Sequence, residues 1–435
     1  MNDSFIIDPR DFISFPFWAC PKCNSPEAFG VLKICEQHYI RKCRSCGYKA
    51  SYSLPQLNKK VIYLDQFAIS NMMKAINPNT KAFQKGTIDN FWIKMFENLD
   101  TLCKLQVIIC PDSIFHANES LLSPYFKPLK QMYELLSYGV SFYDNDTIKR
   151  FQIIQFLKNW LSGNDEAEID LNVNSVVYGK INSWQERFII SVSFLENEEW
   201  IEELRKYREA THRELEKVAS YWKSCKNKDF WDFFEEESMS VGRTCLEIYF
   251  NYYESLRNLR DSLFVNTDII TEKLLPPPAV ILIDEIQSCL LEFGIDKSKI
   301  LEKTIEYLTS PSLKRVPFIK ISSMLYAALA RKFVSGRKKP PNQGMANDIE
   351  VISSLLPYCN AMFIDNECYG YLTEQPLYDH IKEYNTKLFS LNTKEEFLEY
   401  LNQLKLNIPQ DHLDKIKEVY GNDWPKPYMT LYNQE

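Results

Sequence analysis

The sequence predicts an α/β protein in which a parallel sheet flanked by helices is interrupted by a large helical insertion and preceded by a small cysteine-dense module. Short apolar runs that end in a polar residue occur on both sides of the insertion, as expected for buried parallel strands. The stretch between them has apolar residues at helical spacing. We expect the module at residues 1–55, the core at 56–165 and 336–435 (with C-terminal helices in its second part), and the insertion at 166–335.

The composition is that of a packed protein. Of 435 residues, 45% are hydrophobic and 25% are charged. The 12 glycines are too few for β-solenoids or for repeated glycine-rich phosphate loops. The formal charge of −7 disfavours a protein that coats nucleic acid over its whole surface, but it is compatible with a local basic groove.

The sequence predicts a cytoplasmic protein without membrane contact. No stretch reaches the roughly 18 uncharged apolar residues of a membrane helix, and the N-terminus lacks the basic start and apolar run of a signal peptide. In a reducing compartment, closely spaced members of the 12 cysteines indicate metal binding or catalysis rather than disulfides.

Three segments of the first core part predict strands, because each is a short apolar run bounded by polar or turn-forming residues. They are KKVIYLDQ (59–66), LQVIICPDS (105–113) and YGVSFYDND (138–146), and a helix is expected over 148–161. In the second core part, NAMFIDNE (360–367) predicts a further buried strand, preceded by a helix in MANDIEVISSLLPYC.

The insertion is expected to be mostly helical. Residues 184–224 have apolar and aromatic residues at helical spacing with charges between them. Three prolines at 276–278 mark a break before the next helix. The run VILIDE (280–285) looks like an ATPase strand, but no G-x-x-x-x-G-K-[ST] sequence accompanies it, so we expect a helix there too.

Two C-x-x-C pairs indicate a metal site in the N-terminal module. Cys20 and Cys23 are separated by 19 residues from Cys43 and Cys46. Four thiolates on two facing turns supply the tetrahedron that Zn²⁺ binds, and Gly47 allows the backbone to turn at the second pair. We therefore expect a structural zinc ribbon; a redox role for the pairs is the alternative.

The predicted ribbon is locally basic. The residues responsible are Lys22, Arg41, Lys42, Arg44 and Lys49. They form either the solvated surface of a module that needs metal to fold or a surface that docks nucleic acid or protein. Cys35, with His38 three residues later, is expected to pack in the module, with substitution for a zinc ligand as the alternative.

Four acidic residues fall at ends of predicted strands or in first turns of predicted helices. Asp65 and Asp365 follow strands, where polar residues of α/β folds face the ligand crevice. Glu119 and Asp348 lie in helices. Helix capping or a turn explains each one singly. Together they predict one Mg²⁺ or Mn²⁺ site, because hard cations prefer oxygen ligands and can activate water for phosphoryl displacement.

The order strand–Asp, helix–Glu, helix–Asp, strand–Asp resembles that of the PIN-like nuclease domain family. The resemblance rests on VIYLDQFAIS, IICPDSIFHANES, GMANDIEVIS and AMFIDNE, and covers about half of the chain. It implies that Asp65, Glu119, Asp348 and Asp365 bind the metal and catalyse endonucleolytic RNA cleavage that leaves a 5′-phosphate. The long insertion departs from compact members of that family.

A zinc ribbon joined to a PIN-like domain is similar to the ring-activated zinc-finger RNases of bacterial phage defence. That resemblance implies an RNA substrate and a latent, homo-oligomeric enzyme that a ring-shaped phage assembly activates in abortive infection. The ribbon and the insertion are then the expected sensor and assembly surfaces.

Other polar residues near the acids have two interpretations each. A basic stretch is either a solvated loop or a rim that holds RNA phosphates; it comprises Arg331, Lys332 and the RNA-binding candidates Arg337, Lys338 and Lys339. His116 is either a satisfied helix residue or a group that hydrogen-bonds near Glu119. Asn347 and Asn366 flank two acids and could hydrogen-bond water or substrate.

The sequence thus predicts a Mg²⁺- or Mn²⁺-dependent endoribonuclease. The alternative is a zinc-ribbon adaptor that binds RNA or protein through a non-catalytic α/β domain, and a DNA-directed nuclease is a third interpretation.

Overall fold

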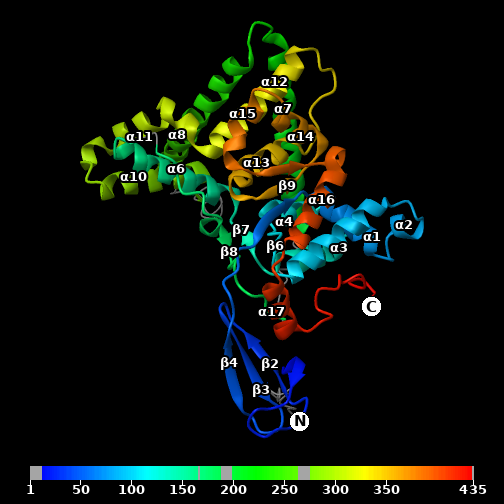
Figure 1. Ribbon diagram of the computed structural model, residues 1–435. Helices are drawn as coiled ribbons and strands as arrows, with labels where there is room; N and C mark the ends of the chain where they lie inside the picture. The colour runs from blue at the N-terminus through cyan, green and yellow to red at the C-terminus, as the bar shows by residue number, and fades with distance from the viewer. Residues whose placement is uncertain (1–11, 165–166, 188–197, 263–274, 434–435) are drawn as a thin grey trace.

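The computed structural model describes residues 12–164, 167–187, 198–262 and 275–433 (Figure 1). At the N-terminus, four antiparallel strands form a sheet in the order β1-β2-β3-β4, which projects from one end of the molecule. The strands are β1 (Ser14–Trp18), β2 (Phe29–Ile34), β3 (His38–Cys43) and β4 (Lys49–Ser53). The predicted cysteine-dense module is confirmed as this antiparallel sheet.

A parallel sheet forms the centre of the molecule. Its strands are β5 (Lys60–Leu64), β6 (Ile108–Ile109), β9 (Ala361–Phe363) and β10 (Lys387–Phe389), in the order β10-β9-β5-β6. In β5 and β9, Ile62 pairs with Ala361 and Leu64 with Phe363. The parallel α/β core predicted from segments on both sides of the insertion is therefore confirmed.

A short strand extends this sheet beyond β6. β7 (Ser141–Phe142) pairs with the antiparallel β8 (Val177–Tyr178), and Ser141 also forms a parallel bridge with Asp112 just after β6. The parallel strands thus follow one another as β7-β6-β5-β9-β10. The chain order reverses direction at β5, so the boundary between β5 and β9 is a topological switch point, where open α/β sheets bind ligands.

Helices cover both faces of the sheet. In the first core part they are α1 (Gln66–Ile76), α2 (Lys81–Gln84), α3 (Asn90–Lys104), α4 (Ile114–Leu121) and α5 (Phe126–Ser137). In the second they are α13 (Met345–Leu355), α14 (Asn366–Thr373), α15 (Leu377–Ile381), α16 (Lys394–Leu406) and α17 (Gln410–Tyr420).

Further helices gather on one side of the sheet (Figure 1). They are α6 (Asn145–Leu161), α7 (Glu198–Ser224), α8 (Phe230–Ser262), α10 (Pro278–Glu292), α11 (Ile300–Leu308) and α12 (Pro317–Val334). The helix predicted over 280–285 is confirmed within α10. None of the helices in the described part of the chain combines the length and apolarity needed to cross a membrane.

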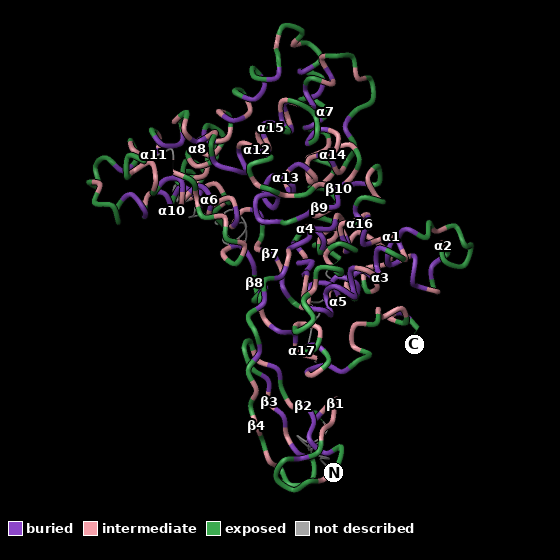
Figure 2. The backbone as a smooth tube through the Cα atoms, viewed as in Figure 1, coloured by how far each residue is buried: buried purple, intermediate pink, exposed green. Residues whose placement is uncertain are grey.

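Side chains of β5 alternate between the two faces and so enter two cores. Val61 and Tyr63 pack with residues of α12, α13 and α14. Ile62 and Leu64 pack with residues of α1, α3, α5 and α16. Figure 2 shows buried backbone in purple around β9 at the centre of the molecule. The neighbouring β5 is buried from Val61 to Leu64, which explains its continuous apolar sequence.

The prediction of helix over 184–224 is wrong at its start. The Trp184 indole donates to the carbonyl of Pro55 at 2.8 Å, and the Gln185 amide donates to the Gln106 side chain at 3.2 Å. These hydrogen bonds to distant segments hold residues 184–187 in an irregular conformation beside Pro55 and Gln106. Residues 188–197 lie outside the described residues, and helix α7 is described from Glu198.

Candidate metal centres

Two of the four predicted acids cap helices at one edge of the sheet. Asp65 directly follows β5 and is the N-cap of α1, where its Oδ1 accepts from the Phe67 amide at 3.2 Å. Asp365 comes two residues after β9 and is the N-cap of α14; its Oδ1 accepts from the amides of Glu367 at 2.7 Å and Cys368 at 3.1 Å. Because β5 and β9 are parallel neighbours, both carboxylates lie at the switch point.

The other two acids come from helices beside that edge. Asp348 lies in the first turn of α13, as predicted. The expectation that Glu119 lies in a first turn is wrong, because it belongs to the last turn of α4, two residues before that helix ends. A carboxylate there gains nothing from the helix dipole, which carries negative charge at its C-terminal end. Helix capping therefore does not explain Glu119.

All four carboxyl groups lie close to one another. Asp65, Glu119 and Asp348 line one pocket together with Asn347 and Gln66. Oxygen atoms of Asp348 and Asp365 and the sulfur of Cys368 all lie within 4.8 Å of one another. The structure thus brings every predicted acid to one point, although the insertion separates them in sequence.

Burial raises the pKa of three of these acids, and repulsion between carboxylates adds to the shift at Asp65 and Asp348. Burial, with the charges of Glu119 and Asp365, raises the pKa of Asp65 to about 7, although the Phe67 amide lowers it. Burial and the charges of Asp65, Asp365 and Glu119 raise the pKa of Asp348 well above its usual value. The pKa of Glu119 is raised by burial too, opposed by the positive charge of Arg208. A bound cation would relieve this repulsion.

The donor atoms fit a hard divalent cation. Oδ2 of Asp365 is buried and has no hydrogen-bond partner among the described residues, and the same holds for Oε1 of Gln66. An unpartnered carboxylate oxygen facing three other carboxyl groups is the oxygen-rich environment that Mg²⁺ and Mn²⁺ prefer. The thiol of Cys368 is not a ligand for Mg²⁺, so the four acids are the expected ligands.

His116 is a buried residue of α4 that packs beside the acid pocket. It is 2% exposed, and its Nε2 lies 2.8 Å from the carbonyl oxygen of Leu64. Its ring stacks between Tyr63 and Tyr133, with centroids 5.1 and 4.6 Å away. Burial lowers the pKa of His116 to about 4, which keeps the ring neutral. Of the two interpretations of His116, the structure favours a packed helix residue.

In the basic loop between α12 and α13, one of the three candidate RNA-binding residues is already held by protein contacts. The Arg337 guanidinium pairs with Glu367, donates to the Tyr371 hydroxyl at 2.8 Å and donates to the Lys339 carbonyl at 2.9 Å. Arg337 therefore braces the loop against the first turn of α14, beside Asp365. Lys338 and Lys339 are exposed.

Three residues near the acids were not predicted from the sequence. Cys368 follows Asp365 by three positions, so the first turn of α14 places both on one side; this spacing was the available signal. Gln66 lines the pocket directly after Asp65. Arg208 approaches from α7, and nothing in the charge pattern of that helix distinguishes it from its neighbours.

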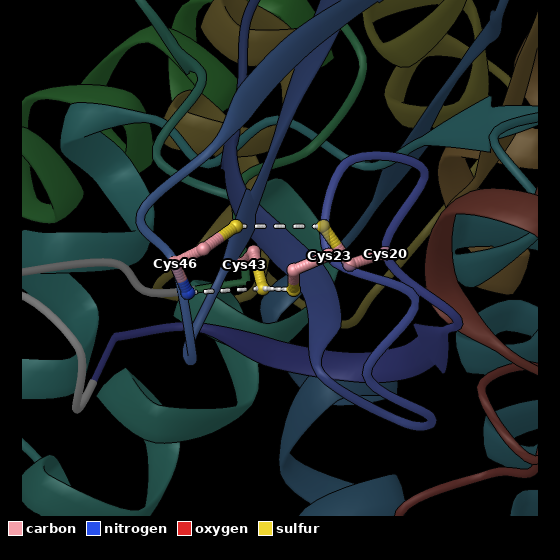
Figure 3. A group of neighbouring side chains, drawn as sticks. All are labelled: Cys20, Cys23, Cys43 and Cys46. Atoms are coloured by element: carbon pink, nitrogen blue, oxygen red, sulfur yellow. Dashed lines mark hydrogen bonds between the residues drawn. The ribbon is translucent and has the colours of Figure 1, made fainter.

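The N-terminal module holds a second candidate metal centre. The sulfurs of Cys20, Cys23, Cys43 and Cys46 point toward one another (Figure 3) and lie within 4.8 Å of one another. The distance from Cys20 to Cys46 is 3.7 Å and that from Cys23 to Cys43 is 3.8 Å. Tetrahedral zinc with bonds of about 2.3 Å requires sulfurs roughly 3.8 Å apart. The four-cysteine group therefore has the geometry to hold zinc.

Backbone amides support the two cysteine turns. Amides of Lys22, Ser45 and Cys46 point at the sulfurs of Cys20 and Cys43 at 3.4–3.5 Å. Such donors stabilise thiolate charge around a metal. Cys35 lies outside the four-cysteine group.

Two basic residues of the module donate to backbone carbonyls, and one of them is buried. Arg41 is fully buried, and its guanidinium donates to the carbonyls of Pro16 at 2.8 Å, Phe29 at 3.0 Å and Glu418 at 2.7 Å. It thereby joins the sheet to α17. Arg44 donates to the Ile13 carbonyl at 2.6 Å. The interpretation as a solvated or docking cation is therefore wrong for Arg41, whereas Arg44 is exposed and for it that interpretation stays a prediction.

Comparisons with known proteins found no match, so the evidence for function comes from the residues of this chain. No family model matches the chain, no curated protein is similar to it, and no solved structure matches its fold.

Proposed function

We propose that the protein is a metal-dependent endoribonuclease with a PIN-like core. The observation that carries the proposal is the convergence of Asp65, Glu119, Asp348 and Asp365 at the switch point of the sheet. The strand order β7-β6-β5-β9-β10 supports it, since this arrangement places two of the acids on adjacent strands. The position of Glu119 supports it as well, because local structure gives no other reason for a buried carboxyl there.

In this proposal each residue has a defined task. The four carboxylates hold Mg²⁺ or Mn²⁺, which supplies a bound water of lowered pKa and offsets the negative charge of the phosphodiester. Asp65 and Asp365 are held by the helices they cap, so their geometry is set before substrate binds. Asn347 lines the same pocket as Glu119 and is the neighbouring side chain that would orient that carboxylate. Packing around His116 keeps the base of the site dry.

The test is cleavage of labelled single-stranded RNA by the full chain with Mn²⁺, with Mg²⁺ and with EDTA, beside single-stranded DNA of the same sequence. The proposal predicts metal-dependent internal cleavage of RNA that leaves ligatable 5′-phosphate ends. Cleavage that persists in EDTA, or that yields 2′,3′-cyclic phosphates, would contradict a metal-activated water. Preferential cleavage of DNA would assign the site to a DNA-directed nuclease.

We also propose that the enzyme is latent in the sense of a low basal cleavage rate in Mn²⁺ that a partner raises, in line with its likeness to ring-activated RNases of phage defence. The exposed Lys22 and Lys49 of the ribbon offer charge for such a contact, and Arg41 connects the ribbon to α17. Adding a purified ring-shaped phage assembly is expected to raise the cleavage rate. An unchanged rate, with active enzyme in the same assay, would contradict this trigger.

A further inference from the structure

We propose that Arg208, supplied by the insertion, binds the phosphate of the RNA substrate at the acid cluster. This inference rests on the proposed function and adds a substrate-binding residue to it. Arg208 lies on α7, which packs against α12 and α13, and α13 carries Asp348. The insertion therefore contributes directly to the site that the two core parts form.

Arg208 lies close to the acid cluster, because the adjacent Tyr207 lines one pocket together with Ile349 and Glu350, which directly follow Asp348. The guanidinium of Arg208 carries a positive charge that acts on both Glu119 and Asp348. Its Nε is buried and has no hydrogen-bond partner among the described residues. The ion pairs that α7 makes within the described chain involve other residues, namely Arg205, His212 and Lys217. Arg208 thus keeps hydrogen-bonding capacity for a ligand.

A phosphate is the ligand that this arrangement suits. Four carboxylates repel an anionic phosphodiester, and a metal ion coordinated by them leaves little surplus positive charge for the substrate. A guanidinium presents a planar fork of N–H donors that matches two phosphate oxygens. Arg337, the other arginine near the acids, is instead occupied by Glu367 and Tyr371.

The test compares Arg208→Ala, Arg208→Lys and the matched control Arg205→Ala, which removes an exposed arginine of the same helix that pairs with Glu202. Binding of a fluorescein-labelled single-stranded RNA is measured in Ca²⁺ over a range of salt concentrations. Cleavage is measured in Mn²⁺, and the Mn²⁺-induced rise in melting temperature reports the metal site.

We expect Arg208→Ala to weaken RNA binding about 10-fold and to lower kcat/KM by about 100-fold. The dependence of RNA affinity on salt concentration should fall by the equivalent of about one phosphate contact. Arg208→Lys should lose less RNA affinity and a smaller part of kcat/KM than Arg208→Ala. Arg205→Ala should have the RNA affinity and kcat/KM of the wild type. The Mn²⁺-induced rise in melting temperature should persist in all four proteins and should not be smaller in Arg208→Ala, because that change removes a positive charge near the metal site.

Equal RNA affinity in wild type and Arg208→Ala would overturn the assignment. So would tighter RNA binding or faster cleavage by Arg208→Ala, which would mean that Arg208 merely neutralises the acids. The binding assay does not depend on cleavage. Absence of cleavage by the wild type would count against the proposed nuclease, whereas equal affinities would count against Arg208 alone.

Discussion

Asp65 and Asp365 follow the ends of neighbouring parallel strands, one residue apart in register, and each caps the helix that follows its strand. The Asp65 amide also donates to the carbonyl of Phe363 at 3.0 Å, which ties the end of β5 to the end of β9. The two carboxyl groups are thus positioned by backbone pairing rather than by flexible loops. A site built in this way is rigid before any ligand arrives.

Asp348→Asn should weaken Mn²⁺ binding by 10-fold or more without unfolding the protein, because it removes one anionic ligand from a site that the strands already position. Calorimetric titration of Mn²⁺ into the full chain measures this. Asp379→Asn is the control, since Asp379 is exposed and its ion pair within the described part of the chain is with Lys382 on the surface. Equal Mn²⁺ affinity in the Asp348 variant and the wild type would remove Asp348 from the metal site.

The metal-free protein should lose stability as the pH rises through about 7. The folded pKa of Asp65 is raised to about 7 from an unfolded value near 3.8, so its neutral form favours the folded state. That stability is complete below about pH 4 and is lost as the carboxyl ionises in the folded protein. Mn²⁺ should restore the melting temperature most strongly at pH 8.

Asp65→Asn serves as the comparison for this pH effect. The metal-free variant should show a smaller decline in melting temperature between pH 5 and pH 8 than the wild type, because one ionising group has been removed. Identical declines in both proteins would show that Asp65 does not ionise in that range.

Removing a cysteine of the four-cysteine group should release one zinc ion per chain. Cys20→Ser or Cys46→Ser leaves three thiolates, too few for a closed tetrahedral site, and the small sheet should then unfold locally. Elemental analysis of the purified protein measures the metal. Cys35→Ser should retain a full zinc complement; its loss there would mean that Cys35 takes part in binding.

Arg41→Ala should lower the free energy of unfolding by about 2–4 kcal/mol, because one buried and two partly buried carbonyl groups lose their donor. Urea unfolding measures the change. Lys49→Ala, which removes an exposed charge of the same module, should change it by less than about 0.5 kcal/mol. An equally small change in the free energy of unfolding for Arg41→Ala would mean that water replaces the hydrogen bonds of Arg41 without a loss of stability.

The strands and the acids that end them were predictable because a strand buried on both faces has a continuous apolar sequence. The run from Val61 to Leu64 and the aspartate after it carry that signal locally. The cysteine pairs were predictable for a similar reason, since zinc fixes their spacing in the sequence.

The roles of the arginines were not predictable, because they depend on contacts between distant segments. Arg41 lies among basic residues and looks like part of a charged surface, yet it is buried against α17. Arg208 is one of several charged residues on a long helix, and only the packing of α7 on α13 brings it near Asp348. Trp184 likewise follows helical periodicity, but its bond to Pro55 keeps the segment irregular.

The most direct measurement is cleavage of labelled RNA in Mn²⁺ by the wild type beside Asp365→Asn, with Asp379→Asn as the control. Among the four acids, Asp365 is the one whose Oδ2 has no hydrogen-bond partner among the described residues. The Asp365→Asn protein should therefore be inactive, while its melting temperature stays at or above that of the wild type. Cleavage by the wild type and the control, with a loss of at least 100-fold in Asp365→Asn, is the predicted result. Equal cleavage by all three proteins would contradict the assignment of this acid cluster as the catalytic centre.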